Sequence, residues 1–112
     1  MKRPLLAAVA ALLVLPAAPL RAEVVFVKYR GTLDLAPLRC DWVTRSSLVQ
    51  RLCFDPRNQY VVVSLKGTYY HYCGVPADVV AEWKGAESMG RYFNAAIKGR
   101  YDCRVTPPPA YR

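Results

Sequence analysis

Residues 55–73 decide the fold, and they read DPRNQYVVVSLKGTYYHYC. Asp55 and Pro56 are typical of a tight turn, since Asp suits its first position and Pro its second. The β-branched and aromatic residues of 60–65 then predict a strand, Lys66 and Gly67 predict a second turn, and residues 68–73 predict another strand. Strands joined by such short connections pair antiparallel.

The flanking residues complete this pattern on both sides. Residues 46–54 predict a strand before the first turn. Pro76 suits the first turn of a helix that ends at Gly85, and Ser88 suits the cap of a second helix that ends at Gly99. The sequence therefore predicts an α+β domain, with a three-stranded antiparallel meander packed against two C-terminal helices in the order β-β-β-α-α.

The N-terminus is typical of an exported protein. Lys2 and Arg3 precede an apolar run from 4 to 20 that is rich in Ala, Leu and Val. We expect residues 1–22 to be a Sec-type signal peptide cut after Ala22, with Ala18 as the alternative cleavage point. An uncleaved membrane anchor is the other interpretation. The run is short for a span and contains Pro16 and Pro19, so we expect no stable span after cleavage.

Export changes both the charge and the environment of the cysteines. Removal of Lys2, Arg3 and Arg21 lowers the formal net charge from +8 to +5, a balance that favours anionic partners. Four cysteines, an even number, remain in a small exported domain and predict two disulfides. The expected location is therefore the periplasm or the outside of the cell.

The predicted meander limits how the four cysteines pair. Cys53 and Cys73 would lie on the first and third strands, about 9–10 Å apart, which is too far for a disulfide. Cys40–Cys53 with Cys73–Cys103, or Cys40–Cys73 with Cys53–Cys103, remain. The first scheme joins sequence neighbours and is preferred, and the second stays open.

The chain divides into four parts on this interpretation. Residues 1–22 are the signal peptide and 23–44 an N-terminal arm, which is an edge strand or an extended segment. Residues 45–105 form the domain. Residues 106–112 contain three consecutive prolines and predict a disordered tail.

Residues 46–101 resemble the KTSC domain, a short module also found at the C-terminus of some lysyl-tRNA synthetases. The matching segments are Ser46-Ser47, Tyr70-His71-Tyr72, Gly74-Val75-Pro76, residues 88–94 and residues 97–101. The family has no established activity, and the synthetase context implies RNA binding. An exported member with four cysteines departs from that context.

The candidate binding residues are aromatic and basic. Tyr70 and Tyr72 share one face of their strand, and the sequence leaves open whether that face is core or exposed. Exposed aromatics beside basic side chains stack single-stranded bases in several modules. The basic candidates are Arg91, Lys98, Arg100 and Arg104.

Catalytic and metal-binding signals are weak by comparison. His71 is the single histidine and has no neighbouring nucleophile motif or metal-ligand spacing. We therefore expect no cofactor, no metal and no enzymatic activity, and a small hydrolase is the third choice. The preferred hypothesis is a non-enzymatic binding module of the bacterial envelope, with an anionic ligand or an envelope protein as partner. An RNA-binding module is the alternative.

Overall fold

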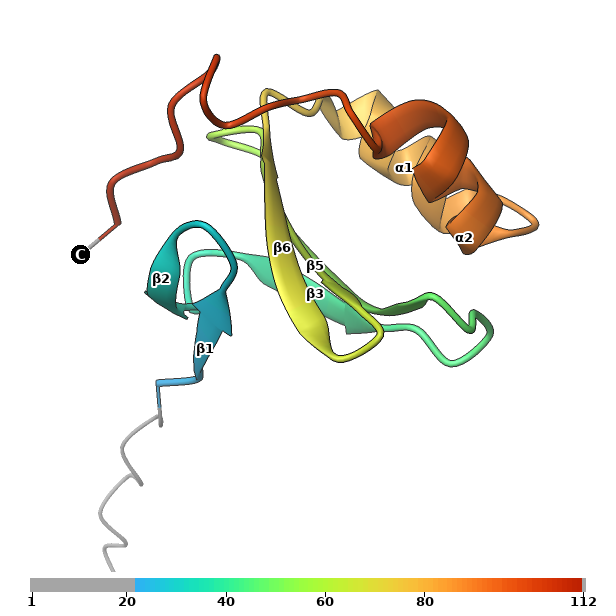
Figure 1. Cartoon of the computed structure of the whole chain (residues 1–112), viewed down its shortest axis with the longest axis horizontal. Coiled ribbons are helices and arrows are strands. Elements are labelled where there is room, and N and C mark those ends of the chain that lie inside the picture. Colours follow the sequence, from blue (N-terminus) through green and yellow to red (C-terminus); the bar gives the residue numbers. More distant parts are fainter. Residues whose placement is uncertain (1–21, 112) are drawn as a thin grey trace, which may run out of the picture.

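The computed structural model describes residues 22–111 (Figure 1). The expected signal peptide, apart from Ala22, lies outside these residues. Within the described part of the chain, no helix has the length and apolar character needed to cross a bilayer.

Residues 22–111 contain one six-stranded sheet, in which the strands lie in the order β2-β1-β6-β5-β4-β3. The strands are β1 Val24–Val27, β2 Gly31–Asp34, β3 Arg39–Trp42, β4 Val49–Asp55, β5 Tyr60–Leu65 and β6 Thr68–Cys73. β1 and β6 run parallel, and the other neighbours are antiparallel. The expected three-stranded meander is therefore wrong, because β4, β5 and β6 are only half of a larger mixed sheet.

The three additional strands all come from the segment expected to be an arm. β1 and β2 form a hairpin beside β6, and β3 pairs with β4 on the far side of the sheet. Each of these strands has four residues. Strands this short carry little alternation, and the parallel contact of β1 with β6 joins segments some forty residues apart, which no local pattern reveals.

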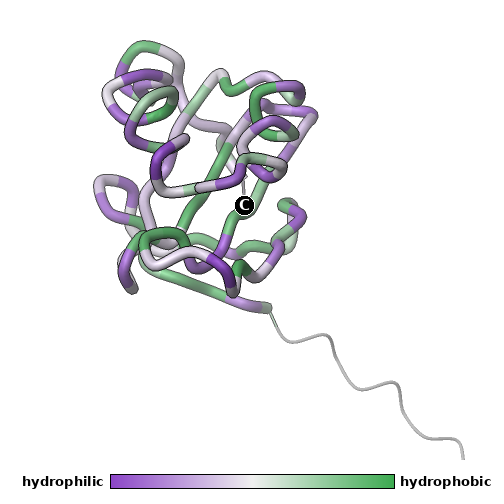
Figure 2. The backbone as a smooth tube through the Cα atoms, turned by 90° about the vertical axis from the view of Figure 1, so that its right-hand side faces the viewer, coloured by the Kyte–Doolittle hydropathy of each residue, from purple (hydrophilic) through white to green (hydrophobic). Residues whose placement is uncertain are grey.

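β5 is buried along its whole length because both faces of the sheet are covered. Val61, Val63 and Leu65 point to the helices, whereas Tyr60 and Val62 point to the opposite face. Figure 2 shows hydrophobic segments running through the middle of the domain. A continuous β-branched run is what a strand buried on both faces requires.

The helical segment covers one face of the sheet. α1 spans Ala77–Gly85, α2 spans Met89–Tyr92, and a π-helical turn, η1, continues over Phe93–Ile97. Ser88 caps α2, its hydroxyl oxygen accepting a hydrogen bond from the Arg91 amide at 3.1 Å. Trp83 is fully buried and its indole N–H donates to the Met89 carbonyl at 3.1 Å.

The hairpin and the chain ends cover the opposite face. Val27 and Leu33 pack with Cys53 and Val62 of the central strands, which curls the sheet into a half-barrel. Pro109 and Tyr111, which belong to the segment expected to be disordered, contact this face. The Tyr111 hydroxyl donates to the Asp55 carboxylate, and the Arg30 guanidinium donates to the Pro109 carbonyl at 2.9 Å.

Two disulfides fasten these covering segments to the sheet. Cys40 of β3 bonds to Cys53, its direct neighbour on β4, with Cα atoms 3.9 Å apart. Cys73 at the end of β6 bonds to Cys103 beyond the helices, with Cα atoms 4.9 Å apart. This is the pairing that joins sequence neighbours.

Candidate binding groove

A groove of about 720 Å³ lies beside β6, between the β1–β2 turn and the segment that follows η1. Its lining is mainly aromatic and basic, and comprises Tyr29, Tyr70, His71, Tyr72, Gly99, Arg100, Asp102, Cys103, Arg104 and Pro108. We call this feature the β6 groove.

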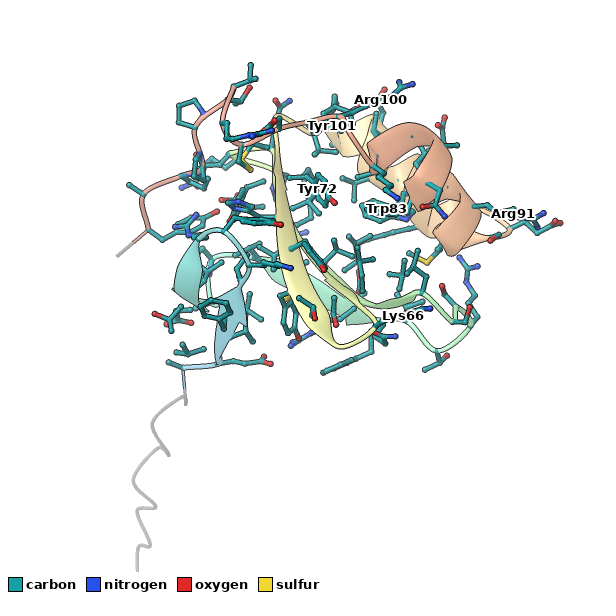
Figure 3. The ribbon with its side chains drawn as sticks, viewed as in Figure 1. Lys66, Tyr72, Trp83, Arg91, Arg100 and Tyr101 are labelled. Atoms are coloured by element: carbon teal, nitrogen blue, oxygen red, sulfur yellow. A yellow bond between two sulfur atoms is a disulfide. The ribbon has the colours of Figure 1, made fainter. Side chains whose placement is uncertain are left out.

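The aromatic part of the groove comes from one face of β6 and from the turn between β1 and β2. Tyr70 and Tyr72 are half-buried, since they pack on the helix-covered core and also line the groove. Tyr72 meets Phe93 edge to face at 5.8 Å between ring centroids, and Figure 3 shows Tyr72 between β6 and the helices. Tyr29 is 82% exposed. The Tyr-bearing face is thus core at its base and open at its rim.

The basic part follows η1, where the chain crosses the end of β6. The Cys73 amide donates to the Tyr101 carbonyl at 2.8 Å, and the Cys73–Cys103 disulfide holds the same crossing. Arg104 forms an ion pair with Asp102 at 2.7 Å. Its hydrogen bonds lower the pKa of Asp102 to about 2. Arg100 is exposed and has no ion-pair partner among residues 22–111, so its charge is available to a ligand.

A third cation, Lys28, lies beside the tyrosines at the other end of the groove. The Lys28 ammonium is 5.5 Å from the Tyr29 ring centroid and 5.8 Å from that of Tyr70. Cations at this distance are attracted to the ring faces. The groove therefore carries positive charge at both ends, and Asp102 is the one side-chain carboxylate among the described residues that line it.

His71 is held in a structural contact. Its Nδ1 lies 2.9 Å from the hydroxyl oxygen of Tyr60, which is fully buried. Burial lowers the pKa of His71, and the nearby Arg30 charge lowers it further, while Asp102 opposes them. The neutral imidazole is thereby favoured at neutral pH.

Four of the six residues expected to bind lie together in the β6 groove: Tyr70, Tyr72, Arg100 and Arg104. Lys98 is exposed outside its lining. Figure 3 shows Arg91 at the opposite end of the helical segment from Arg100. Sequence reasoning missed Tyr29 and Lys28, because only the parallel pairing of β1 with β6 brings the hairpin to this edge. It also missed Asp102, which the Cys73–Cys103 disulfide and the Cys73–Tyr101 hydrogen bond hold beside β6.

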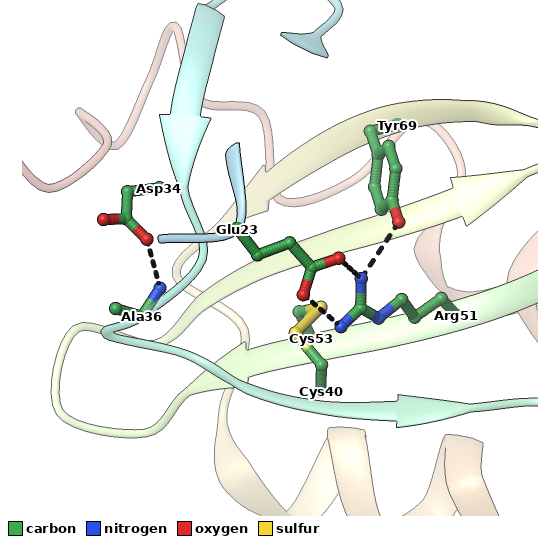
Figure 4. A network of polar contacts seen from close by, with 7 residues as sticks. All are labelled: Glu23, Asp34, Ala36, Cys40, Arg51, Cys53 and Tyr69. Atoms are coloured by element: carbon green, nitrogen blue, oxygen red, sulfur yellow. Dashed lines mark hydrogen bonds and ion pairs between the residues drawn. A yellow bond between two sulfur atoms is a disulfide. The ribbon is translucent and has the colours of Figure 1, made fainter. Parts of the chain in front are cut away.

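A second polar cluster braces the hairpin side of the sheet (Figure 4). The buried Arg51 guanidinium donates to both carboxylate oxygens of Glu23 and, at 3.3 Å, to the Tyr69 hydroxyl. The hydrogen bonds from Arg51 lower the pKa of Glu23. Trp42, 68% exposed, lies under the same guanidinium at 4.3 Å. Both terminal nitrogens of Arg51 are engaged within the chain, whereas its buried Nε has no hydrogen-bond partner among the described residues. The ion pair with Glu23 leaves a ligand little free charge at this cluster.

The protein is a small disulfide-bonded α+β domain. Its helices cover one face of a curled sheet, and segments linked by disulfides cover the other face. Residues 45–101 match the KTSC domain family, and the chain belongs to that family. An uncharacterized protein of Stutzerimonas stutzeri is 36% identical over 58 residues, which are 51% of this chain and 82% of that protein. A crystal structure of a KTSC domain protein from Yersinia pestis superposes with a TM-score of 0.55 at 29% identity, covering 58% of this chain and 92% of that chain.

The family match divides the groove into two sets of residues. Tyr70, His71, Tyr72 and Arg100 lie within residues 45–101. Tyr29 precedes the matched segment, and Asp102, Arg104 and Pro108 follow it. The KTSC segment thus supplies the floor of the groove, and the two flanking segments supply its rim.

Proposed function

We propose that this protein is a non-enzymatic binding module of the bacterial cell envelope and that its ligand occupies the β6 groove. The observation that carries the proposal is the convergence on one concave site of three tyrosines and of Arg100, which has no ion-pair partner among residues 22–111. Ligand sites are typically concave, 300–1,000 Å³ in volume, and combine apolar walls with few polar groups.

The envelope location is part of the proposal. It is supported by the N-terminal sequence, which lies outside the described residues, and by four cysteines placed within disulfide distance. Glu23, the first residue after the expected cleavage point, contacts Arg51, and its carbonyl accepts from the Leu35 amide at 2.9 Å. Cleavage after Ala22 would therefore keep these contacts of Glu23 in the mature chain. N-terminal sequencing of the protein from periplasmic and cytoplasmic fractions tests this part.

The non-enzymatic part rests on His71. Its ring nitrogen is engaged with the buried Tyr60 hydroxyl, and a general base needs a nucleophile within hydrogen-bond reach. A structural role accounts for the histidine.

Site-specific photo-crosslinking in cells that produce the full chain tests the groove. A photoreactive phenylalanine derivative replaces Tyr29 at the groove rim, and the matched control carries it at Ala81, exposed on α1. We expect discrete adducts from position 29 that Arg100→Gln diminishes, and none from position 81. Equal labelling from both positions, or no adduct from position 29, would contradict the proposal.

Nucleic-acid binding is the second candidate, because tyrosines beside arginines also suit stacked bases. Fluorescence anisotropy with a labelled single-stranded oligouridine at low salt tests it. Affinity that falls steeply with salt and drops in Arg100→Gln, but not in Lys98→Gln, would favour this alternative over a protein ligand. Lys98→Gln is the matched control, since Lys98 is exposed and lies outside the groove lining.

A further inference from the structure

The edge of β6 is unpaired at its centre, and this gap opens into the β6 groove. At one end the Lys28 amide donates to the Tyr69 carbonyl at 2.8 Å, and at the other the Cys73 amide donates to the Tyr101 carbonyl at 2.8 Å. The single pair that β1 forms with β6, Val27 with Tyr69, lies at the first of these ends. No strand within residues 22–111 pairs with β6 at His71 from this side.

The alternation of the ladder determines which groups face the gap. In an antiparallel pair, successive residues direct their main-chain groups alternately toward the partner strand and away from it. Tyr69 and Cys73 bond outward, so Tyr70 and Tyr72 bond inward to β5, where they pair with Val63 and Val61. The N–H and C=O of His71 therefore point outward, into the groove that His71 lines.

We propose that the β6 groove binds a short peptide segment in extended conformation, which carries a carboxylate and adds to the open edge of β6 at His71. This inference rests on the proposed binding function and specifies its ligand. Addition of a strand to an exposed edge is a general mode of peptide recognition.

The dimensions of the gap suit three or four residues. The stretch from Tyr69 to Cys73 covers four residue steps, or about 13 Å at the rise of a strand. Tyr70 and Tyr72 lie on one side of the edge and Tyr29 rises from the β1–β2 turn. The Lys28 ammonium contacts the rings of both Tyr29 and Tyr70, so Tyr29 lies on the same side of the edge. Because side chains of an extended peptide alternate, every second side chain of the bound segment would meet this aromatic surface.

The charges of the groove complement a carboxylate. Arg100 lies near the Cys73 end of the gap and Lys28 near the Tyr69 end, and Arg100 has no ion-pair partner among the described residues. A guanidinium binds a carboxylate through paired N–H donors. A donor and an acceptor in the plane of the sheet, as on His71, match the repeating N–H and C=O of the peptide main chain, whereas the phosphodiester backbone of a nucleic acid has no repeating N–H donor.

The first test needs no ligand. The His71 amide, which has no strand partner among residues 22–111, should exchange with deuterium markedly faster than the amides of Tyr70 and Tyr72, as followed by NMR of the oxidised full domain. Equal protection of the three amides would overturn the proposal, because the edge would then be closed.

The second test is an NMR titration with defined peptides. The probe is acetyl-Thr-Val-Thr-Val with a free carboxylate, compared with the same peptide methylated on its two central nitrogens. We expect the probe to shift the His71, Tyr29 and Arg100 amide signals while the buried Trp83 indole signal stays in place. Methylation should weaken binding roughly fivefold or more, because each lost main-chain hydrogen bond contributes about 1 kcal/mol.

Two further probes and two variants address the carboxylate. The C-terminal amide removes the charge, and acetyl-Glu-Val-Thr-Val amide moves it to a side chain, so the pair distinguishes a terminal from an acidic-residue ligand. Arg100→Gln should weaken the charged probes but leave the uncharged amide unchanged, and Lys98→Gln should bind all probes as the parent does.

The outcomes separate this inference from the proposed function. If the methylated peptide binds as tightly as its parent while shifting the groove signals, strand addition is wrong and the groove remains a binding site. If no peptide shifts His71 at ~1 mM but oligouridine does, the ligand is a nucleic acid and the inference is wrong. If neither probe shifts any groove residue, the inference fails and the proposed function loses its support.

Discussion

The two faces of the sheet are built from different parts of the chain. The core under the helices, which we call the helix-side core, contains residues from Val49 to Ile97, all inside the KTSC segment. The core on the opposite face, the hairpin-side core, takes half of its buried residues from the preceding segment: Val27, Leu33, Leu35 and Leu38. The family segment therefore supplies one complete core and one sheet face that other segments must cover.

The disulfides belong to only one of these cores. Cys53 and Cys73 are buried in the hairpin-side core, and Cys40 and Cys103 pack against it. A small domain gains most from cross-links where its core is assembled from distant segments, since closing long loops is entropically costly. The same fastening holds Cys103 and Arg104 beside β6, so the hairpin-side core also shapes the groove.

The largest expected effect comes from breaking the helix-side core. Trp83→Ala should lower the free energy of unfolding by about 3–5 kcal/mol, because it empties a fully buried site and removes the hydrogen bond to Met89. Urea denaturation followed by circular dichroism measures it. Trp42→Ala is the matched control, and its exposed ring and cation contact predict a loss of about 1 kcal/mol or less. Similar losses for both tryptophans would refute the division into core and surface.

The second-largest loss of stability should come from removing a disulfide, which weakens the hairpin-side core. Cys73→Ala with Cys103→Ala, and Cys40→Ala with Cys53→Ala, should each lower the free energy of unfolding by about 3 kcal/mol. The loop of 30 residues should exceed the loop of 13 by about 0.7 kcal/mol on chain entropy alone. Urea denaturation of the two double variants measures both quantities. A negligible loss in either one would show that its cysteines do not support this core.

A smaller effect should follow from releasing the C-terminal tail. Tyr111→Phe removes the hydroxyl that donates to Asp55 and keeps the ring against Tyr60, so it should cost about 1 kcal/mol. Tyr29→Phe provides the control, since that hydroxyl is on an exposed side chain and its loss should leave stability unchanged. Thermal unfolding of the two variants compares them, and equal behaviour would mean that the tail contributes nothing to the hairpin-side core.

The smallest effect is a pH dependence centred on His71. Its pKa in the folded state is below the ordinary 6.5, chiefly through burial and the Arg30 charge. The unfolded chain therefore binds a proton first, and stability should fall as pH drops below about 6.5, only over the interval between the unfolded and the folded pKa values. Glu23, Asp55 and Asp102, whose pKa values are also lowered, act only in a more acidic range.

Urea midpoints between pH 7.5 and 5 measure this dependence. His71→Gln should remove the slope in that window while costing some stability at pH 7.5 through the lost contact with Tyr60. An unchanged slope in the variant would assign the dependence to another group.

The sequence predicts the helix-side core well and the hairpin-side core poorly, for physical reasons. The strands expected at 60–65 and 68–73 have those bounds, since β-branched runs and tight turns act over a few residues. The three short strands were missed because their pairing is set by contacts of the whole sheet. Tyr70 and Tyr72 carry a strand signal, whereas Tyr29 enters the groove only through the parallel contact between β1 and β6.

Hydrogen exchange of the oxidised and the reduced protein, read residue by residue, tests the central claim most directly. Reduction should expose the amides of β1, β2 and β3 and the Cys73 amide bonded to Tyr101, while β5 and α1 keep their protection. Loss of protection that begins in α1, or that spreads uniformly over the sheet, would contradict a hairpin-side core held by disulfides around the β6 groove.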